Sequence, residues 1–291
     1  MRRLLINADD FGLTPGVNRA IAGLHDAGCL LSTTLMATGE AFTDAVTLAT
    51  ARPALAVGCH IVLTDGIPVL PPQEIPSLME GSHVRPHFRD KLGSFVRDLM
   101  LGRLNEAEIE REAIAQIRKL QDAGICVSHI DSHKHAHMFP AIARPLARAA
   151  NACGVHALRN PFEPQWSIRG GSLLRRVQMR MLSRLREPFF AQFNESAFGI
   201  PEGTLGISAT GDLHADSLHD LLDLMPEGTW ELVCHPGYND AALDAVTTRL
   251  RQHREIEFNA LLTEIPQALR NYPDLQLNSY RDVHPTTQEA P

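Results

Sequence analysis

Histidine and aspartate, which bind divalent metal ions more readily than most residue types, gather in one short segment of this chain. Four of its fourteen histidines lie there, His129, His133, His135 and His137, together with Asp131. Side chains alternate between the two faces of a strand, so His129, Asp131 and His133 would share a face. Imidazole and carboxylate suit Zn²⁺ and similar ions, which favours a metal site over a solvated loop.

Two further candidates follow apolar runs near the start of the chain. Asp9 and Asp10 come directly after Arg3–Ala8 and would diverge at the bend, one toward a metal and one toward a water. The alternative for this pair is a turn with a capping aspartate for the next helix. His60 ends the run Ala54–His60, where the alternative is a hydrogen-bonded core histidine.

The last candidates lie in the second half of the chain. His235 follows the apolar run Thr229–Cys234 and precedes Pro-Gly, which would present it rigidly on a sharp turn. Its ordinary pKa near neutrality suits a general acid, and the alternative is a turn histidine without chemistry. Arg159 ends the short apolar run Ala157-Leu158.

Apolar runs and helical patterns alternate along the chain. The expected strands are Arg3–Ala8, Cys29–Met36, Ala54–His60, Cys126–Asp131, 157–159, Thr229–Cys234 and Leu275–Ser279. The expected helices are Pro15–Ala27, Ala41–Ala51, Asn105–Ala123, Pro140–Ala152 and Ala242–Leu269. This order predicts one α/β domain with a mostly parallel sheet, open or closed into a barrel. The carboxyl ends of parallel strands meet at one edge, where we expect the candidates to converge.

Two insertions interrupt the alternation. Segment 65–91 is rich in proline and long enough to be a functional loop. Segment 165–201 contains Leu173–Arg186, whose apolar residues at helical spacing lie among arginines and predict a basic amphipathic helix. That helix would pack on the protein, meet a second subunit or contact a membrane. Residues 281–291 are expected to form a flexible tail of the single domain 1–291.

Composition restricts the class of protein. The 291 residues include 27 lysines and arginines against 34 acids, a net charge of −7, which argues against a nucleic-acid partner. No apolar run approaches the roughly 20 residues that cross a bilayer, and the start lacks the apolar region of an export signal. Five scattered cysteines suggest free thiols. We therefore expect a cytoplasmic globular protein.

Several of these motifs, in this order, resemble the YdjC/ChbG-like carbohydrate deacetylase family: residues 7–12, 58–64, 129–140, 158–159 and 234–238. The resemblance implies a single-domain (β/α) barrel, TIM-like but distorted, related to the polysaccharide deacetylases. It also implies removal of an acetyl group from an N-acetylated sugar with one divalent metal ion. Segment 65–76 resembles the narrower hopanoid-biosynthesis-associated deacetylases, which implies a hopanoid carrying an N-acetylglucosaminyl group as substrate.

The resemblance also implies roles by position. Asp10, His60 and His133 would bind the metal, Asp9 would be the general base, and His235 would protonate the leaving amine. Arg159 would lie beside the carboxylates. Substrate contacts or neighbours of the metal are expected among His129, Asp131, His135, His137, Leu63, Thr64 and Tyr238, with a backbone N–H near Leu63 or Thr64 as candidate oxyanion donor.

Other functions stay open on the sequence alone. The substrate could be a soluble chitooligosaccharide rather than a glycolipid. The H-x-H spacing of His133, His135 and His137 also occurs in metal-dependent phosphoesterases and amidohydrolases, and a sugar- or lipid-binding protein without turnover is a further alternative. Zinc is the expected ion, while Mg²⁺, Mn²⁺, Co²⁺ and Ni²⁺ also accept these ligands. A homodimer and peripheral contact with the inner membrane through Leu173–Arg186 are further alternatives, beside packing of that helix on the protein itself.

Overall fold

A seven-stranded parallel sheet forms the centre of the protein. The computed structural model describes residues 1–80, 87–168, 173–193 and 198–285. The strand order is β6-β3-β2-β1-β8-β7, with β9 also paired to β1. Its strands are β1 (Arg2–Phe11), β2 (Ser32–Leu35), β3 (Ala56–Ile61), β6 (Val127–Ser132), β7 (Gly203–Leu205), β8 (Gly228–Cys234) and β9 (Leu275–Asn278). Every pair in this sheet is parallel.

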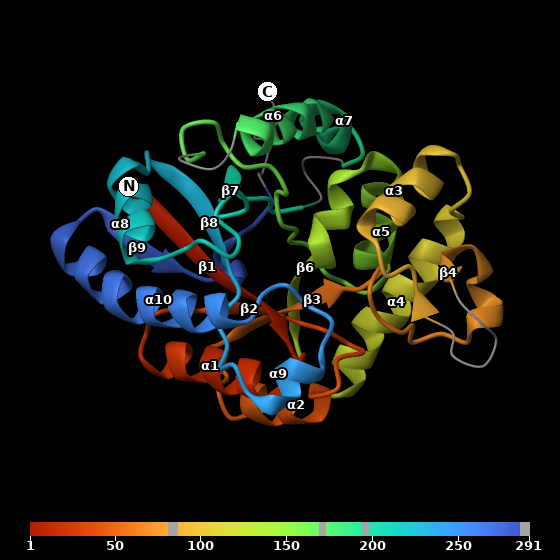
Figure 1. Ribbon diagram of the computed structural model, residues 1–291, viewed down its shortest axis with the longest axis horizontal. Helices are drawn as coiled ribbons and strands as arrows, with labels where there is room; N and C mark the ends of the chain where they lie inside the picture. Colours follow the sequence, from red (N-terminus) through yellow and green to blue (C-terminus); the bar gives the residue numbers. More distant parts are fainter. Residues whose placement is uncertain (81–86, 169–172, 194–197, 286–291) are drawn as a thin grey trace.

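Helices surround the sheet (Figure 1). They are α1 (Pro15–Asp26), α2 (Phe42–Thr50), α3 (Leu92–Met100), α4 (Glu106–Asp122), α5 (Pro140–Ala152), α6 (Leu173–Leu182), α7 (Arg186–Phe190), α8 (Ala215–Leu224), α9 (Ala241–Ala245) and α10 (Gln252–Asn271). Short 3-10 helices are η1 (Pro72–Glu74), η2 (Pro76–Leu78), η3 (His133–Met138), η4 (Ser183–Leu185) and η5 (Tyr280–Asp282). Helix α4 packs against α5, α10 against α8, and α1 against α2.

The sheet curls into a half-barrel whose edges are β6 and β7. Isolated bridges from Ile130 to Leu158 and from Ala157 to Gly199 continue the pairing beyond β6. The strand expected at 157–159 is therefore present only as bridges. The expected α/β architecture with a parallel sheet is confirmed, but among the described residues the sheet is a curled half-barrel and not the expected (β/α) barrel.

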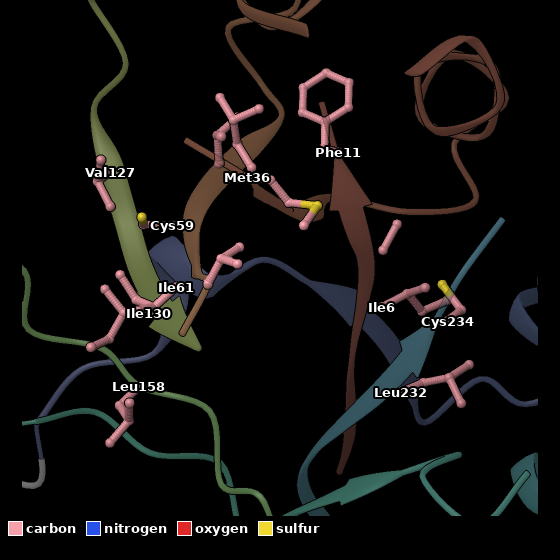
Figure 2. Packing of buried hydrophobic residues seen from close by; sticks show 14 of the residues in the cluster. Ile6, Phe11, Met36, Cys59, Ile61, Val127, Ile130, Leu158, Leu232 and Cys234 are labelled. Atoms are coloured by element: carbon pink, nitrogen blue, oxygen red, sulfur yellow. The ribbon is translucent and has the colours of Figure 1, made fainter. Parts of the chain in front are cut away.

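Alternation along the strands separates an apolar outer face from a polar inner face. In β1, Ile6 belongs to the apolar cluster, whereas Asn7 donates its side-chain N–H to Asp9 on the inner face. In β8, Leu232 packs in the same cluster, while Glu231 is buried among polar groups. Figure 2 shows the apolar side chains of neighbouring strands packed together. The core thus lies between sheet and helices, which leaves the inner face for a polar site.

One expected helix is wrong in extent. Ala242–Leu269 is not continuous, because α9 ends at Ala245 and α10 begins only at Gln252. The break contains Val246, Thr247 and Thr248, three β-branched residues with low helix propensity. The Thr248 hydroxyl accepts a hydrogen bond from the Leu250 backbone N–H, which competes with helical bonding. The break starts a new helix beside the site.

The 165–201 insertion is helical over much of its described length. The expected helix Leu173–Arg186 is present as α6, and the chain then continues as the 3-10 helix η4. Val177 and Met181 are 47% and 59% exposed, whereas Leu182 and Leu185 pack against the core. The exposed apolar side chains therefore lie on a face of the helix that the protein does not cover.

The remaining segments add local detail. The proline-rich segment 65–91 contains η1, η2 and an antiparallel pair, β4 (Met79–Glu80) and β5 (His87–Phe88). Helices α3 and α8 and strand β7 were not among the expected elements.

The expected C-terminal tail begins with an anchored turn, because Arg281 donates to the carbonyl oxygens of Pro53 and Leu55. Residues 286–291 lie outside the described ones. Among the described residues, no helix combines the length and apolar character needed to cross a bilayer.

Candidate active site

A bulge at the carboxyl end of β1 separates the two adjacent aspartates. The register of β1 against β2 shifts between Ala8 and Phe11, and Asp10 has a φ of 66°. A left-handed backbone costs a non-glycine residue free energy, which is typical of functional sites. The bulge lets the two carboxylates point to different partners, Asp9 to Arg159 and Asp10 to Arg254.

Asp10, His60 and His133 form a group that could hold a metal ion. Asp10 Oδ1 lies 3.6 Å from His60 Nε2 and 3.6 Å from His133 Nδ1. The three side chains come from the end of β1, the end of β3 and the first residue of η3. Two imidazole nitrogens and one carboxylate oxygen are a fitting donor set for a catalytic divalent ion, since further positions would stay open.

Asp131 orients His60 from the side opposite the nitrogen that faces Asp10. His60 Nδ1 lies 2.8 Å from Asp131 Oδ1, which leaves Nε2 directed at Asp10. Such a carboxylate behind a ligand histidine is a common support in metal sites. Burial alone would lower the pKa of His60, but the carboxylates of Asp131 and Asp9 outweigh it and raise the pKa to about 9.

A second group of potential ligands, Asp9, His60 and Asp131, is already paired with Arg159 through both of its carboxylates. This guanidinium is completely buried and donates to both oxygens of Asp9, at 2.8 and 2.6 Å. Its nitrogens also lie 2.6 Å from Asp131 Oδ2 and 2.7 Å from Glu231 Oε1. Because Arg159 occupies this group, the group around Asp10 is the better candidate for the metal.

Burial would raise the pKa of Asp9, but the Arg159 and His60 charges outweigh it and hold that pKa well below its usual range. Asp10 is likewise kept ionised: burial opposes, and Arg254 and His133 more than compensate. Both carboxylates are therefore available as anions.

The charges buried around the site do not balance. The carboxylates are those of Asp9, Asp10, Asp131, Glu231 and Glu257, and the guanidinium groups are those of Arg159 and Arg254. Three negative charges remain in excess when the histidines are neutral, and two remain when His60 is protonated, as its raised pKa implies for the metal-free protein. Buried charges require compensation, and a divalent cation would supply most of it.

His235 completes the arrangement from the end of β8. Its Nε2 lies 3.9 Å from Asp9 Oδ2, and its backbone N–H donates to Glu257 Oε2 at 2.6 Å. Its Nδ1 is buried and has no hydrogen-bond partner among the described residues. Asp9 and His235 are thus two proton-transfer candidates at the same edge of the sheet.

His129 lies deeper on the inner face than the group formed by Asp10, His60 and His133. Its ring stacks on Tyr280 at 3.6 Å between centroids, and its Nε2 lies 3.2 Å from Asn7 Oδ1. Burial, reinforced by Arg159, holds the pKa of His129 well below its usual value, so the ring is neutral. The structure brings Asp131 to the site and leaves His129 as a support of Asn7.

The two histidines of η3 beyond His133 differ in their contacts. His137 Nδ1 lies 2.6 Å from the Ser132 hydroxyl, which ties the ring to the end of β6. His135 has a φ of 52°, and its Nδ1 is buried without a partner in the described part of the chain. Burial, with Arg159, lowers the pKa of His135 to about 3. A neutral, unpaired imidazole of this kind suits contact with a ligand.

The remaining predicted residues are less directly placed. Thr64 is completely buried, and its hydroxyl has no partner within the described ranges, whereas Leu63 packs in the apolar core. Tyr238 packs against Phe258 of α10, with ring centroids 5.3 Å apart. Thr64 therefore offers a free polar group beside β3, and Tyr238 supports the loop after β8.

Sequence reasoning missed Arg254 and Glu257, both on α10 and both 1% exposed. Arg254 donates to Asp10 Oδ2 at 2.6 Å, and Glu257 binds the backbone of His235. The signal was present in the helical period. The buried stripe of α10 continues through Leu261 and Ile265, and extending it backward by two turns places these two charges on the buried face.

Fold and site together define an α/β protein with a candidate metal centre at the carboxyl edge of a curled parallel sheet. A model of the YdjC-like protein family matches residues 3–270, and the chain belongs to that family. A carbohydrate deacetylase of Brevibacillus brevis is 34% identical over 242 residues, which are 83% of this chain and 84% of the relative. One of Vibrio campbellii is 30% identical, covering 90% and 89%.

A crystal structure from Enterococcus faecalis V583 has a similar fold over nearly the whole chain. It is 25% identical, has a TM-score of 0.76, and covers 97% of this chain and 99% of its own. That protein is described as a proposed cellobiose-phosphate cleavage protein. The family resemblance drawn from the motifs is confirmed.

Proposed function

We propose that this chain is a carbohydrate N-deacetylase, a hydrolase that uses one divalent metal ion to release acetate from an N-acetylglucosaminyl substrate. The observation that carries the proposal is the convergence of His60 and His133 on Asp10, directly beside the pair Asp9 and His235. Relatives that align over most of the chain are carbohydrate deacetylases, which supports the same class. Zinc fits the nitrogen-rich ligand set best.

The chain's own residues supply the proton transfers. A divalent ion at Asp10, His60 and His133 would polarise the amide carbonyl and make a water more acidic. Asp9, held at both oxygens by Arg159, takes the proton of the attacking water. His235 then protonates the amide nitrogen, because that nitrogen does not leave as an anion. The proposed products are acetate and a free amino sugar.

We propose a hopanoid glycolipid as the substrate, supported by the resemblance of segment 65–76 and by the uncovered side of α6. Val177 and Met181 are exposed there, with Arg180 and Arg184 exposed nearby. Apolar side chains among arginines are typical of a surface that contacts anionic lipid. Binding to vesicles of anionic phospholipid should weaken in Arg180→Gln/Arg184→Gln. Unchanged co-sedimentation would contradict the membrane role and favour contact of this face with a second subunit.

The substrate is tested by acetate release from two compounds with the zinc-loaded protein: an N-acetylglucosaminyl hopanoid in detergent, and diacetylchitobiose. Turnover of the hopanoid alone supports the glycolipid. Turnover of chitobiose alone makes this a deacetylase of soluble oligosaccharides. Release from neither, with metal bound, contradicts the proposed function and favours a phosphoesterase or a sugar-binding protein; two ions per chain would favour the former.

A further inference from the structure

We propose that the first turns of α10 act as a clamp that fixes Asp10 and His235 relative to each other, with Arg254 and Glu257 as its positioning residues. The inference rests on the proposed function, because it takes Asp10 as a metal ligand and His235 as the proton donor. Arg254 and Glu257 are one helical turn apart and share the buried face of α10. Arg254 acts through Asp10, and Glu257 acts through His235.

Arg254 fixes the rotation of the Asp10 carboxylate. Its Nη2 donates to Asp10 Oδ2 at 2.6 Å, and its Nε donates to the Leu250 carbonyl at 3.2 Å. With Oδ2 engaged, Oδ1 is the oxygen that lies 3.6 Å from both His60 and His133. The guanidinium therefore selects which carboxylate oxygen faces the two histidines.

Glu257 holds His235 at two points. Its Oε2 accepts the His235 backbone N–H at 2.6 Å and lies 3.9 Å from His235 Nδ1. Its other oxygen accepts the Gly211 N–H at 3.4 Å. His235 Nδ1 is buried without another partner in the described residues, so Glu257 is the acceptor toward which the ring can turn. Turning Nδ1–H to this carboxylate would leave Nε2 toward Asp9.

The loop after β8 lies directly against the same helix. Gly237 donates its N–H to the Arg254 carbonyl at 3.2 Å, and Arg254 Nη1 lies 3.5 Å from the His235 carbonyl. A Cβ at Gly237 would come within 3.0 Å of Arg254 Cδ and of Val17 Cγ2. The close approach explains glycine at this position and brings the histidine loop within reach of both charged side chains.

Burying two charges in an otherwise apolar helix face has a desolvation cost, and apolar residues often stabilise such positions equally well or better. The stripe continues as Leu261 and Ile265. Packing alone does not require Arg254 and Glu257, whereas orientation of Asp10 and His235 does. Outer partners of this kind typically account for 10- to 100-fold in affinity or activity.

The Glu257 half of the clamp is tested with Glu257→Gln, His235→Gln and the double variant, using zinc-loaded protein and acetate release. Glu257→Gln should lower kcat about 10- to 100-fold with KM unchanged. In the His235→Gln background the same change should alter kcat less than twofold, because Glu257 acts through His235. A multiplicative loss in the double variant would mean a merely structural role and would overturn the assignment.

Glu255→Gln is the matched control for that cycle. Glu255 lies on the same helix, is exposed, and accepts the Asn239 N–H at 2.8 Å from the same loop, yet within the described part of the chain it forms no hydrogen bond or ion pair with Asp9, Asp10 or His235. It should keep kcat within twofold. An equal loss in Glu255→Gln and Glu257→Gln would reduce Glu257 to a loop anchor.

The Arg254 half is tested without turnover, by titrating metal-free Arg254→Gln with zinc. If orientation of Asp10 dominates, zinc affinity falls about 10- to 100-fold. If the Arg254 guanidinium acts only as a positive charge that competes with the ion, the variant binds zinc more tightly than the wild type. That result would overturn the clamp. Arg251→Gln, which removes an ion pair with Asp244 and hydrogen bonds to the carbonyl oxygens of Leu243 and Val246, should leave zinc affinity unchanged. If the wild type binds zinc but releases no acetate, the proposed function is wrong. The zinc titration still tests whether Arg254 orients Asp10.

Discussion

Two adjacent aspartates have different chemistry because their neighbours differ. Asp9 is held at both oxygens by Arg159 and faces His235, while Asp10 keeps one oxygen toward two histidines. The bulge at the end of β1 produces this division. Substituting either aspartate with asparagine preserves the shape, removes the charge and replaces one acceptor oxygen with an NH2 donor, so the two variants are matched controls for each other.

The two asparagine variants should fail in different ways. Asp10→Asn should weaken zinc binding by more than about 100-fold, because it alters a proposed ligand rather than an outer partner. Asp9→Asn should retain zinc and lose about 10²- to 10⁴-fold in kcat, the range of a general base. Zinc titration and acetate release on both variants measure this. Near-normal turnover in Asp9→Asn would contradict the assigned base.

Metal binding should depend on pH through His60. The nearby carboxylates raise its pKa to about 9, so below that pH the ring of the metal-free protein carries a proton that an ion at Nε2 must displace. Apparent zinc affinity should therefore rise about tenfold per pH unit and level off near pH 9. Competition with a chelator between pH 6.5 and 9.5 checks the slope. A flat profile would place the ion away from His60.

Strands β3 and β6 approach each other closely at Gly58, because glycine has no side chain. Gly58 in β3 faces the His129 ring of β6, and a Cβ there would lie 2.5 Å from it. The inner face therefore gains room for a stacked His129 and Tyr280. Glycine at this position is required by the neighbouring strand rather than by its own backbone.

Gly58→Ala should destabilise the protein by about 1–3 kcal/mol, the usual cost of overpacking. Gly93 is the control, since nothing lies within 4 Å of a Cβ built on it in α3. Gly93→Ala should be neutral or stabilise by up to about 1 kcal/mol, because alanine favours helix. Urea unfolding of both variants measures the difference. Equal stability of the two would show that His129 moves aside without cost.

Element boundaries show what local sequence could and could not predict. Pro140–Ala152 was expected and is present with the same bounds, because proline begins it and its apolar spacing is regular. The break between α9 and α10 was missed, since its β-branched residues lie inside a longer helical pattern. The strand-end positions of Asp9, His60 and His235 were predictable from apolar runs. The helical period of α10 places Arg254 and Glu257 on its buried face, but the residues that they contact depend on how α10 docks.

At the scale of the whole molecule, Arg159 joins strands that are far apart in sequence. It contacts Asp9 of β1, Asp131 of β6 and Glu231 of β8, and Tyr280 donates its hydroxyl to Glu231 at 2.5 Å. One guanidinium thus connects the edge strand β6 with the centre of the curled sheet. The same contacts that orient the site also hold the half-barrel together.

Arg159→Met should cost about 3–5 kcal/mol of unfolding free energy, because it leaves buried carboxylates unpaired. Arg52→Met removes a surface pair with Asp26 and should cost no more than about 1 kcal/mol. Chemical denaturation of the metal-free proteins compares the two. A loss as small for Arg159 as for Arg52 would mean that water or protonation compensates the carboxylates.

The most direct test of the account is acetate release from an N-acetylglucosaminyl substrate while zinc is added stepwise to metal-free protein. The group around Asp10 could hold one ion, and Arg159 already pairs with the neighbouring carboxylates of Asp9 and Asp131. We expect release to be absent without metal, to rise linearly, and to reach its plateau at one zinc per chain. Release without metal, or a plateau only at two ions per chain, would contradict the proposed centre.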